Sequence, residues 1–158
     1  MIRRLLIMIA AAAWCTSALA QSAAPPAVPG AAPPADIQFQ PSPRDDRETI
    51  EAAQTWLALV DAGKFGLAWD DASPHLKSVV TRAKWIAGMS EARKPFGKLK
   101  ERTPARFARS HSMPGAPEGD YSIIEFETEF ANGKRATEQI IWMLGDNGVW
   151  RVSGYYIR

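Results

Sequence analysis

YSIIEFETEF at residues 121–130, followed by ANGK and then by RATEQIIWML at residues 135–144, decides the fold of this chain. Apolar and polar residues alternate in the first segment, with Ile124 and Phe126 on one face, which predicts a strand with one buried side. Asn132-Gly133 is typical of a two-residue type I′ turn. The second segment is therefore predicted to return as the antiparallel partner of the first.

Two further strands are predicted beside this hairpin. Residues 102–111 contain Pro104, which an edge strand tolerates because one side of its backbone forms no ladder hydrogen bonds. Asp146-Asn147-Gly148 is a turn sequence, and residues 149–157 follow it as the last strand. We therefore expect a curved, four-stranded antiparallel meander.

The preceding region carries helical patterns. Apolar residues recur at helical spacing across residues 48–61, and Gly63 ends this helix. A short helix is expected at residues 65–69. Ser73-Pro74 and Thr81 are typical N-terminal caps of two more helices. Helices that precede an antiparallel sheet predict an α+β fold in which the helices cover one face of the sheet.

The N-terminus has the pattern of a secretory signal peptide. Arg3 and Arg4 precede the apolar run 5–14, and small residues end at Ala20, where we expect cleavage. The apolar run is shorter than the roughly 18 residues that a membrane span needs. Lipidation at Cys15 is the other alternative, although Trp14 before it is bulkier than a lipid-attachment site favours. We expect a periplasmic or secreted protein without stable membrane insertion.

Residues 21–43 are rich in Ala and Pro, which predicts a disordered tether before one folded domain at residues 44–158. The net charge of +2 comes from Arg3 and Arg4 of the signal peptide, which also contains the only cysteine. The processed chain therefore has neither a disulfide nor a thiol nucleophile, and its balanced charge argues against nucleic acid as a partner.

Three separated segments carry a family resemblance, namely WLALVDAGKFGLAWDDASPHLKSVVTRAKW, MPGAPEGDY and VWRVSGYYIR. Together they resemble the exported bacterial family known as domain of unknown function 4019, over about residues 48–158. The resemblance implies a cone-shaped fold similar to nuclear-transport-factor-two-like and cystatin-like domains. It implies no activity, so no catalytic residue is transferred from it.

Alternate acidic residues mark the strand at residues 121–130. Glu125, Glu127 and Glu129 share one face, and a two-residue turn would put Glu127 opposite Glu138. Two adjacent carboxylates can raise one pKa or collect a cation. Cross-strand ion pairs are the alternative, and the neighbouring strand offers three arginines for them: Arg102, Arg106 and Arg109.

The other face of these strands is expected to mix apolar residues with polar ones. Thr128, Thr137, Gln139 and Tyr156 are the candidate ligand-binding residues in this mixture. They would either line a pocket under the helices or form the polar ends of a packed core.

Motifs for other chemistry are missing from the sequence. His75 lies close to Asp70 and Asp71, but these residues are interpreted as parts of helix ends. His111 is the only other histidine, and no ligand spacing predicts a metal site. No cofactor motif and no serine-nucleophile motif is present.

The leading functional hypothesis is therefore a non-catalytic binding or assembly module of the cell envelope. The alternative is a small cofactor-free lyase, isomerase or hydrolase that uses Glu127 or Glu138 with Tyr156. The partner is expected to be a small molecule or an envelope protein, and the sheet could also mediate a homodimer. The five tryptophans after residue 50 are expected in the core rather than at a stacking surface.

Overall fold

The computed structural model describes residues 47–158, which form one helical layer and one sheet. The helices are α1 (Arg47–Asp61), α2 (Phe65–Asp70), α3 (Pro74–Val79) and α4 (Arg82–Arg93). The strands are β1 (Leu99–Ser110), β2 (Tyr121–Phe130), β3 (Arg135–Leu144) and β4 (Trp150–Ile157). The predicted signal peptide and tether lie outside the described residues, as do residues 44–46.

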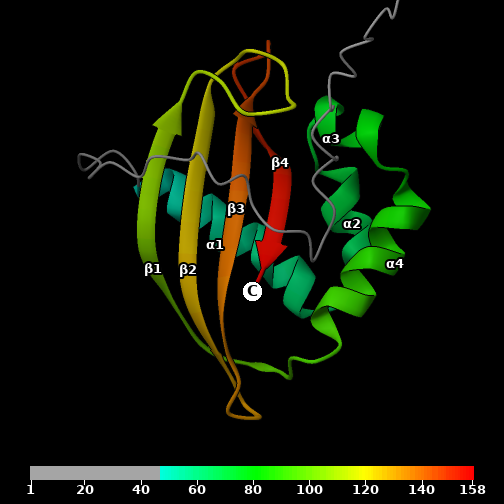
Figure 1. Cartoon of the computed structure of the whole chain (residues 1–158), viewed down its shortest axis with the longest axis vertical. Coiled ribbons are helices and arrows are strands. Elements are labelled where there is room, and N and C mark those ends of the chain that lie inside the picture. Colours follow the sequence, from blue (N-terminus) through cyan, green and yellow to red (C-terminus); the bar gives the residue numbers. More distant parts are fainter. Residues whose placement is uncertain (1–46) are drawn as a thin grey trace, which may run out of the picture.

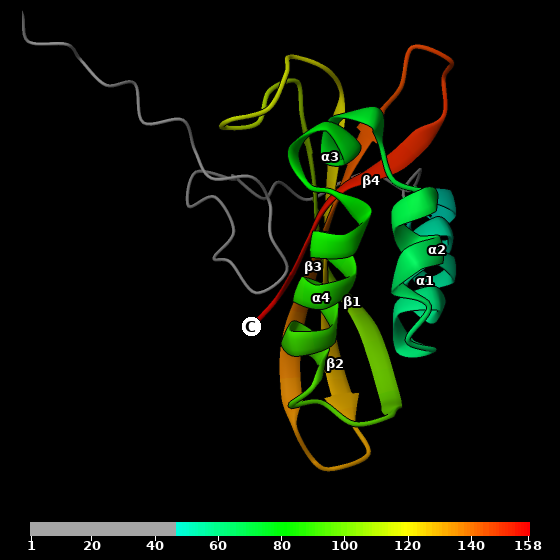
Figure 2. The ribbon, with the colours of Figure 1, turned by 90° about the vertical axis from the view of Figure 1, so that its right-hand side faces the viewer.

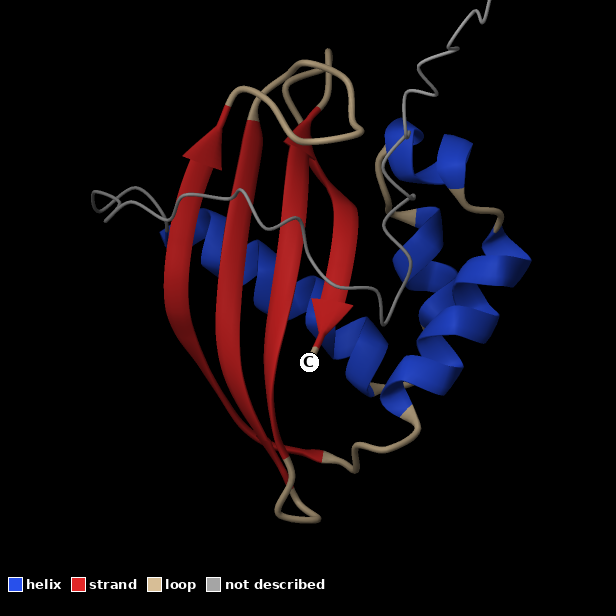
Figure 3. Ribbon diagram, in the orientation of Figure 1, coloured by secondary structure: helices blue, strands red, loops and turns tan. Residues whose placement is uncertain are grey.

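The strands form a single four-stranded sheet in the order β1-β2-β3-β4, and each neighbouring pair is antiparallel. The sheet is curved, and α1 crosses its far side in the view of Figure 1. Figure 2 shows α1 and α2 side by side, and α4 packs against α2. The separation of helices and strands is plain in Figure 3. The predicted α+β fold is confirmed.

Side-chain caps start two of the helices as predicted. Ser73 Oγ accepts a hydrogen bond from Leu76 N–H at 3.1 Å, at the start of α3. Thr81 Oγ1 accepts one from Lys84 N–H at 3.4 Å, at the start of α4. These bonds satisfy backbone donors that lack partners within the helix.

Strand β1 begins at Leu99, three residues earlier than expected, and it is an edge strand. Its pairing with β2 is irregular between Pro104 and Arg106. Proline lacks the N–H that a regular ladder requires, so a break in register at an edge accommodates it.

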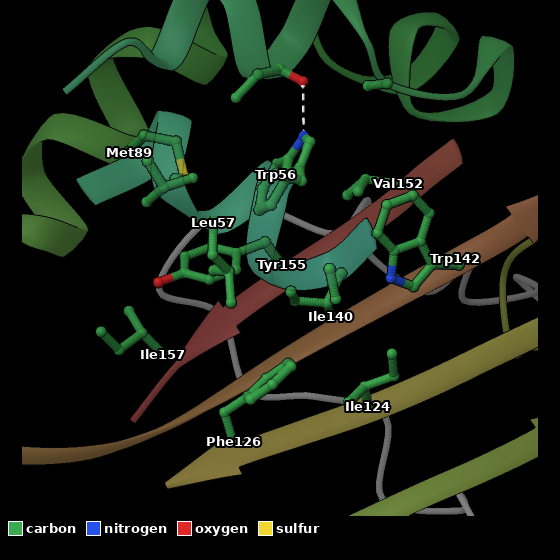
Figure 4. Close-up of a cluster of buried hydrophobic side chains, with 14 of the residues drawn as sticks. Trp56, Leu57, Met89, Ile124, Phe126, Ile140, Trp142, Val152, Tyr155 and Ile157 are labelled. Atoms are coloured by element: carbon green, nitrogen blue, oxygen red, sulfur yellow. Dashed lines mark hydrogen bonds between the residues drawn. The ribbon is translucent and has the colours of Figure 1, made fainter. Parts of the chain in front are cut away.

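Aromatic and aliphatic side chains fill the space between the helices and the sheet. Figure 4 shows Trp56 and Leu57 of α1 above Ile140 of β3 and Tyr155 of β4. Trp56 Nε1 donates to Ala68 O at 3.1 Å, so the indole packs without leaving an unpaired donor. The tryptophans at 56, 85 and 142 are at most 4% exposed, as expected for core residues. Within residues 47–158, no helix has both the length and the apolar character needed to cross a membrane.

Candidate functional site

The β2–β3 turn differs from the two-residue turn that the sequence predicts. Phe130 N–H donates to Lys134 O at 2.8 Å, and Gly133 N–H donates to Phe130 O at 2.9 Å. Gly133 has φ +81°, whereas no non-glycine residue of the described chain has positive φ. Asn132 therefore cannot occupy the left-handed position that a type I′ turn requires. Residues 131–133 form a three-residue loop with a left-handed glycine.

The longer loop shifts the pairing of β2 and β3 by one residue. Glu138 pairs with Phe126, and Glu127 pairs with Thr137. The expectation that Glu127 lies opposite Glu138 is therefore wrong. Because strand side chains alternate, a slip of one residue moves each of them to the opposite face.

The shift separates the candidate ligand-binding residues. We call the helix-covered side of the sheet the inner face and the opposite side the outer face. Thr128 lies on the inner face, where its hydroxyl contacts Glu138. Thr137 pairs with Glu127, and Gln139 pairs with Tyr156, so these residues belong to the outer face.

The inner face holds a buried cluster of charged and polar side chains, which we call the ionic network. α1, α4 and each of the four strands contribute one member. Its members are Asp61, Arg93, Arg102, Thr128, Glu138 and Tyr155. It links the helical layer to the whole width of the sheet.

Each carboxylate of the ionic network contacts both guanidinium groups. Arg93 donates to Glu138 Oε1 and to Asp61 Oδ1, both at 2.7 Å. Arg102 donates through Nη1 and Nη2 to Asp61 at 2.8 and 2.9 Å. Arg102 Nε reaches Glu138 Oε2 at 2.8 Å. Two cations and two anions therefore balance in a nearly dry site, as a stable buried ion cluster requires.

Two hydroxyl groups complete the surroundings of Glu138. Tyr155 Oη donates to Oε1 and Thr128 Oγ1 donates to Oε2, each at 2.6 Å. The Glu138 side chain has no exposed surface. Both of its oxygens are therefore occupied by donors from the protein, and neither faces a space where a substrate could exchange a proton with it.

The pKa values in the ionic network shift in the directions that this arrangement requires. Burial, together with the charge of Glu138, raises the pKa of Tyr155 well above its usual value. Burial alone would lower the pKa of Arg102, but the hydrogen bond to Asp61 and the nearby carboxylates outweigh it and raise that pKa. The hydroxyl stays protonated and the guanidinium stays charged at neutral pH.

Glu127 lies in a different environment, on the outer face. It is exposed and accepts a hydrogen bond from Thr137 Oγ1 at 3.1 Å. It lines a cavity of about 310 Å³ together with Glu101 and Glu129. Glu129 is paired with Lys100 at 2.6 Å, and this bond lowers its pKa.

Cross-strand ion pairs account for much of the acidic face, as the alternative interpretation predicts. Glu129 also pairs with Arg135 at 3.4 Å. Glu125 pairs with Arg158 at 2.7 Å and with Arg106 at 3.7 Å. Arg102 does not join them, because it points to the inner face and enters the ionic network.

Tyr156 is separated from both candidate carboxylates. It is 4% exposed on the outer face, and burial raises its pKa. Glu138 lies on the inner face, and Glu127 lies on β2, which β3 separates from the strand that carries Tyr156. The structure therefore does not bring Glu127, Glu138 and Tyr156 together in one site.

A second cavity, of about 360 Å³, lies where the start of α3 meets the β3–β4 hairpin and the β1–β2 loop. These segments gather near one end of the sheet (Figure 1). His75 lines the cavity and is half-buried. We call this space the end cavity. Its charged lining residues are Asp146 and Arg151.

The neighbours of His75 in sequence have structural roles. Asp70 pairs with Arg82 at 2.9 Å, which lowers the Asp70 pKa through the hydrogen bond. Ser73 caps α3, as predicted. His111 contacts Asp120 at 2.6 Å far along the chain from His75. Residues 47–158 contain no group of three side chains placed to hold a metal ion.

Sequence reasoning missed Asp61 and Arg93 in the ionic network, and Asp146 and Arg151 in the end cavity. Asp61 and Arg93 are both last residues of helices, 32 positions apart. A charge at a helix end is usually solvated, so nothing local distinguishes these two from ordinary surface charges.

Comparison with known proteins supports the family resemblance that the sequence motifs suggest. The chain belongs to the family described as "Protein of unknown function (DUF4019)", whose model matches residues 52–155. No curated protein matches the chain. A solved structure described as "2.5 Angstrom structure of from Catenulispora Acidiphila" is similar at 11% identity and a TM-score of 0.45, covering 70% of this chain and 88% of that one.

Proposed function

We propose that the folded domain is a non-catalytic binding module that acts in the cell envelope after export. One observation carries the non-catalytic part of the proposal. Both carboxylates of the ionic network, Asp61 and Glu138, are bound by the same two arginines. A general acid or base needs an unblocked oxygen within reach of a substrate, and these carboxylates offer none.

The end cavity supports the binding part of the proposal. Its volume of about 360 Å³ falls within the range of about 300–1,000 Å³ that small-molecule sites occupy. It joins apolar walls with a few polar groups, which is the usual composition of such sites. The N-terminal sequence pattern supports export of the domain, which is part of the same proposal.

Photo-crosslinking in the living host tests this function. A photoreactive residue replaces Val149, which lines the end cavity and is 45% exposed, while Leu67 on α2, at 52%, is the matched control. We expect the probe at 149 to label a discrete envelope molecule and the probe at 67 to label none. Equal labelling at both positions, or none at either, contradicts the proposal.

A small cofactor-free enzyme is the second candidate, and one observation favours it. His75 and Asp146 line the same cavity, and an imidazole with a carboxylate is the minimum equipment for acid-base catalysis. Burial lowers the pKa of His75, which keeps the imidazole neutral and able to accept a proton near neutral pH. A reaction that the wild-type protein performs and the folded His75→Asn variant does not would establish this candidate over the first.

A further inference from the structure

The end cavity contains two opposite charges that lack ionic partners within the described chain. Arg151 Nη1 donates to the amide oxygen of Asn147 at 3.3 Å, and no carboxylate of residues 47–158 pairs with this guanidinium. Asp146 makes no ion pair with any described residue, Arg151 included. Most other arginines that we describe are paired with an acid, which sets Arg151 apart from them.

The walls between these charges are apolar. Pro74 of α3, Pro117 of the β1–β2 loop and Met143 of β3 come together there. Val149 adds a side chain that is 45% exposed. When a hydrocarbon group of a ligand covers this apolar wall, the complex is stabilised by about 25 cal/mol per Å² of apolar surface removed from water.

The uncharged polar groups of the cavity do not change this charge pattern. Ser78 Oγ donates to His75 O at 2.7 Å, and Ser73 Oγ is engaged as the helix cap. The imidazole of His75 is half-buried, and desolvation lowers its pKa, so it is neutral at neutral pH. The formally charged residues of the lining are Arg151 and Asp146.

Hydrogen bonds hold the start of α3 and the β3–β4 hairpin in place. Ser73 N–H donates to Val152 O at 2.8 Å, which fixes the start of α3 beside β4. Asn147 Oδ1 accepts from Val149 N–H at 3.2 Å as well as from Arg151. A Cβ at Gly145 would lie 3.0 Å from Asn147 Oδ1, so the glycine leaves room for this arrangement. A site that is already ordered loses less entropy when it binds.

We propose that the end cavity binds a small zwitterion of amino-acid or dipeptide size with an apolar side chain. The carboxylate of the ligand pairs with Arg151, its ammonium group pairs with Asp146, and its side chain covers the apolar wall. A ligand that carries both charges satisfies both residues, whereas a simple acid or amine leaves one charge of the cavity unmatched. This inference rests on the proposed binding function and specifies its ligand.

Titration of the full chain, exported by its host and purified, tests the ligand class. The probes are L-leucine and L-leucyl-L-leucine. N-acetyl-L-leucine lacks the ammonium group, and L-leucinamide lacks the carboxylate. Calorimetry measures affinity, and two-dimensional NMR shows which backbone amides shift.

Arg151→Gln and Asp146→Asn are the test variants. The control is Arg135→Gln, which removes an exposed arginine that is paired with Glu129 outside the cavity.

We expect one of the two zwitterions to bind more tightly than both of its blocked analogues and to shift amides around residues 73–78 and 143–151. Arg151→Gln should weaken that binding by about tenfold or more, which corresponds to about 1.4 kcal/mol. Asp146→Asn should weaken binding of the zwitterion but not of N-acetyl-L-leucine, while the control variant should bind as the wild type does.

Two results overturn the inference. One is the absence of amide shifts around the cavity with either zwitterion at about 10 mM, a concentration that would fill most of a site with a Kd of about 1 mM. The other is an affinity that Arg151→Gln leaves unchanged. If the probe at Val149 labels an envelope molecule in cells while no zwitterion binds, the binding function stands and only this ligand class is wrong.

Discussion

Arg93, the last residue of α4, donates a 2.7 Å hydrogen bond to Glu138 in the middle of β3. The two residues are 45 positions apart, and both side chains are at least nine-tenths buried. A charge this deep is stable only with a partner of opposite sign. The contact therefore fixes the end of the helical layer to the sheet, and the stability of the domain should depend on it.

Removing the negative charge of Glu138 should be costly. Glu138→Gln leaves Arg93 and Arg102 sharing one carboxylate, and breaking a buried ion pair from one side costs about 3–5 kcal/mol. The exposed neighbour provides the control, because Glu127→Gln should change stability by less than about 0.5 kcal/mol. Urea unfolding measures both. Equal losses in the two variants would contradict the ionic network as we describe it.

Removing Arg93 and Glu138 together should cost less than the sum of the single changes. The pair Arg102 and Asp61 remains balanced and bidentate in the double variant. We expect a coupling energy on the order of 1–3 kcal/mol from a double-mutant cycle with methionine at both positions. The exposed pair Lys100 and Glu129 should give less than about 1 kcal/mol in the same cycle. Additive effects at Arg93 and Glu138 would argue against their direct interaction.

Alkaline pH should destabilise the domain through Tyr155. Its folded pKa is raised by burial and by Glu138, so the folded state keeps a proton that the unfolded state loses near pH 10. The stability that this pKa difference gives the folded state is fully present below pH 10. Above pH 10 it falls by about 1.4 kcal/mol per pH unit, until the folded pKa is reached. Tyr155→Phe should therefore lose stability less steeply than the wild type between pH 10 and 11. Parallel curves from urea titrations would contradict the prediction.

The three-residue β2–β3 loop should depend on its glycine. Gly133 has φ +81°, a conformation that strains an L-residue, so Gly133→Ala should cost about 1 kcal/mol. Gly97→Ala is the control, because Gly97 does not have positive φ and its added Cβ would meet Asn132 at an ordinary 3.4 Å. Guanidinium unfolding of both variants measures the difference. A Gly133→Ala variant as stable as the control would mean that the loop has another conformation.

The strands were predictable from sequence, and their register was not. Alternation located residues 121–130 and 135–144 at the bounds that the structure has. The length of the loop could not be predicted, because Asn-Gly suits a two-residue loop and also the end of a three-residue loop. The one extra residue of the loop decides whether Glu138 lies beside Glu127 or beneath the helices.

The ionic network and the end cavity could not be predicted for a different reason. Their residues lie on separate elements, and only tertiary packing brings them together. Arg102 illustrates the difficulty, since it was expected to neutralise the outer acidic face and instead turns inward to Asp61 and Glu138. Charge alone does not show which face of an edge strand a side chain will occupy.

The measurement that tests the central claim most directly is native mass spectrometry of the protein purified gently from the envelope of its own host. The account predicts a chain that begins at Gln21 and carries a non-covalently bound molecule, which is released on denaturation. A chain that keeps residues 1–20, or a processed chain whose native and denatured masses are the same, would contradict an exported binding module.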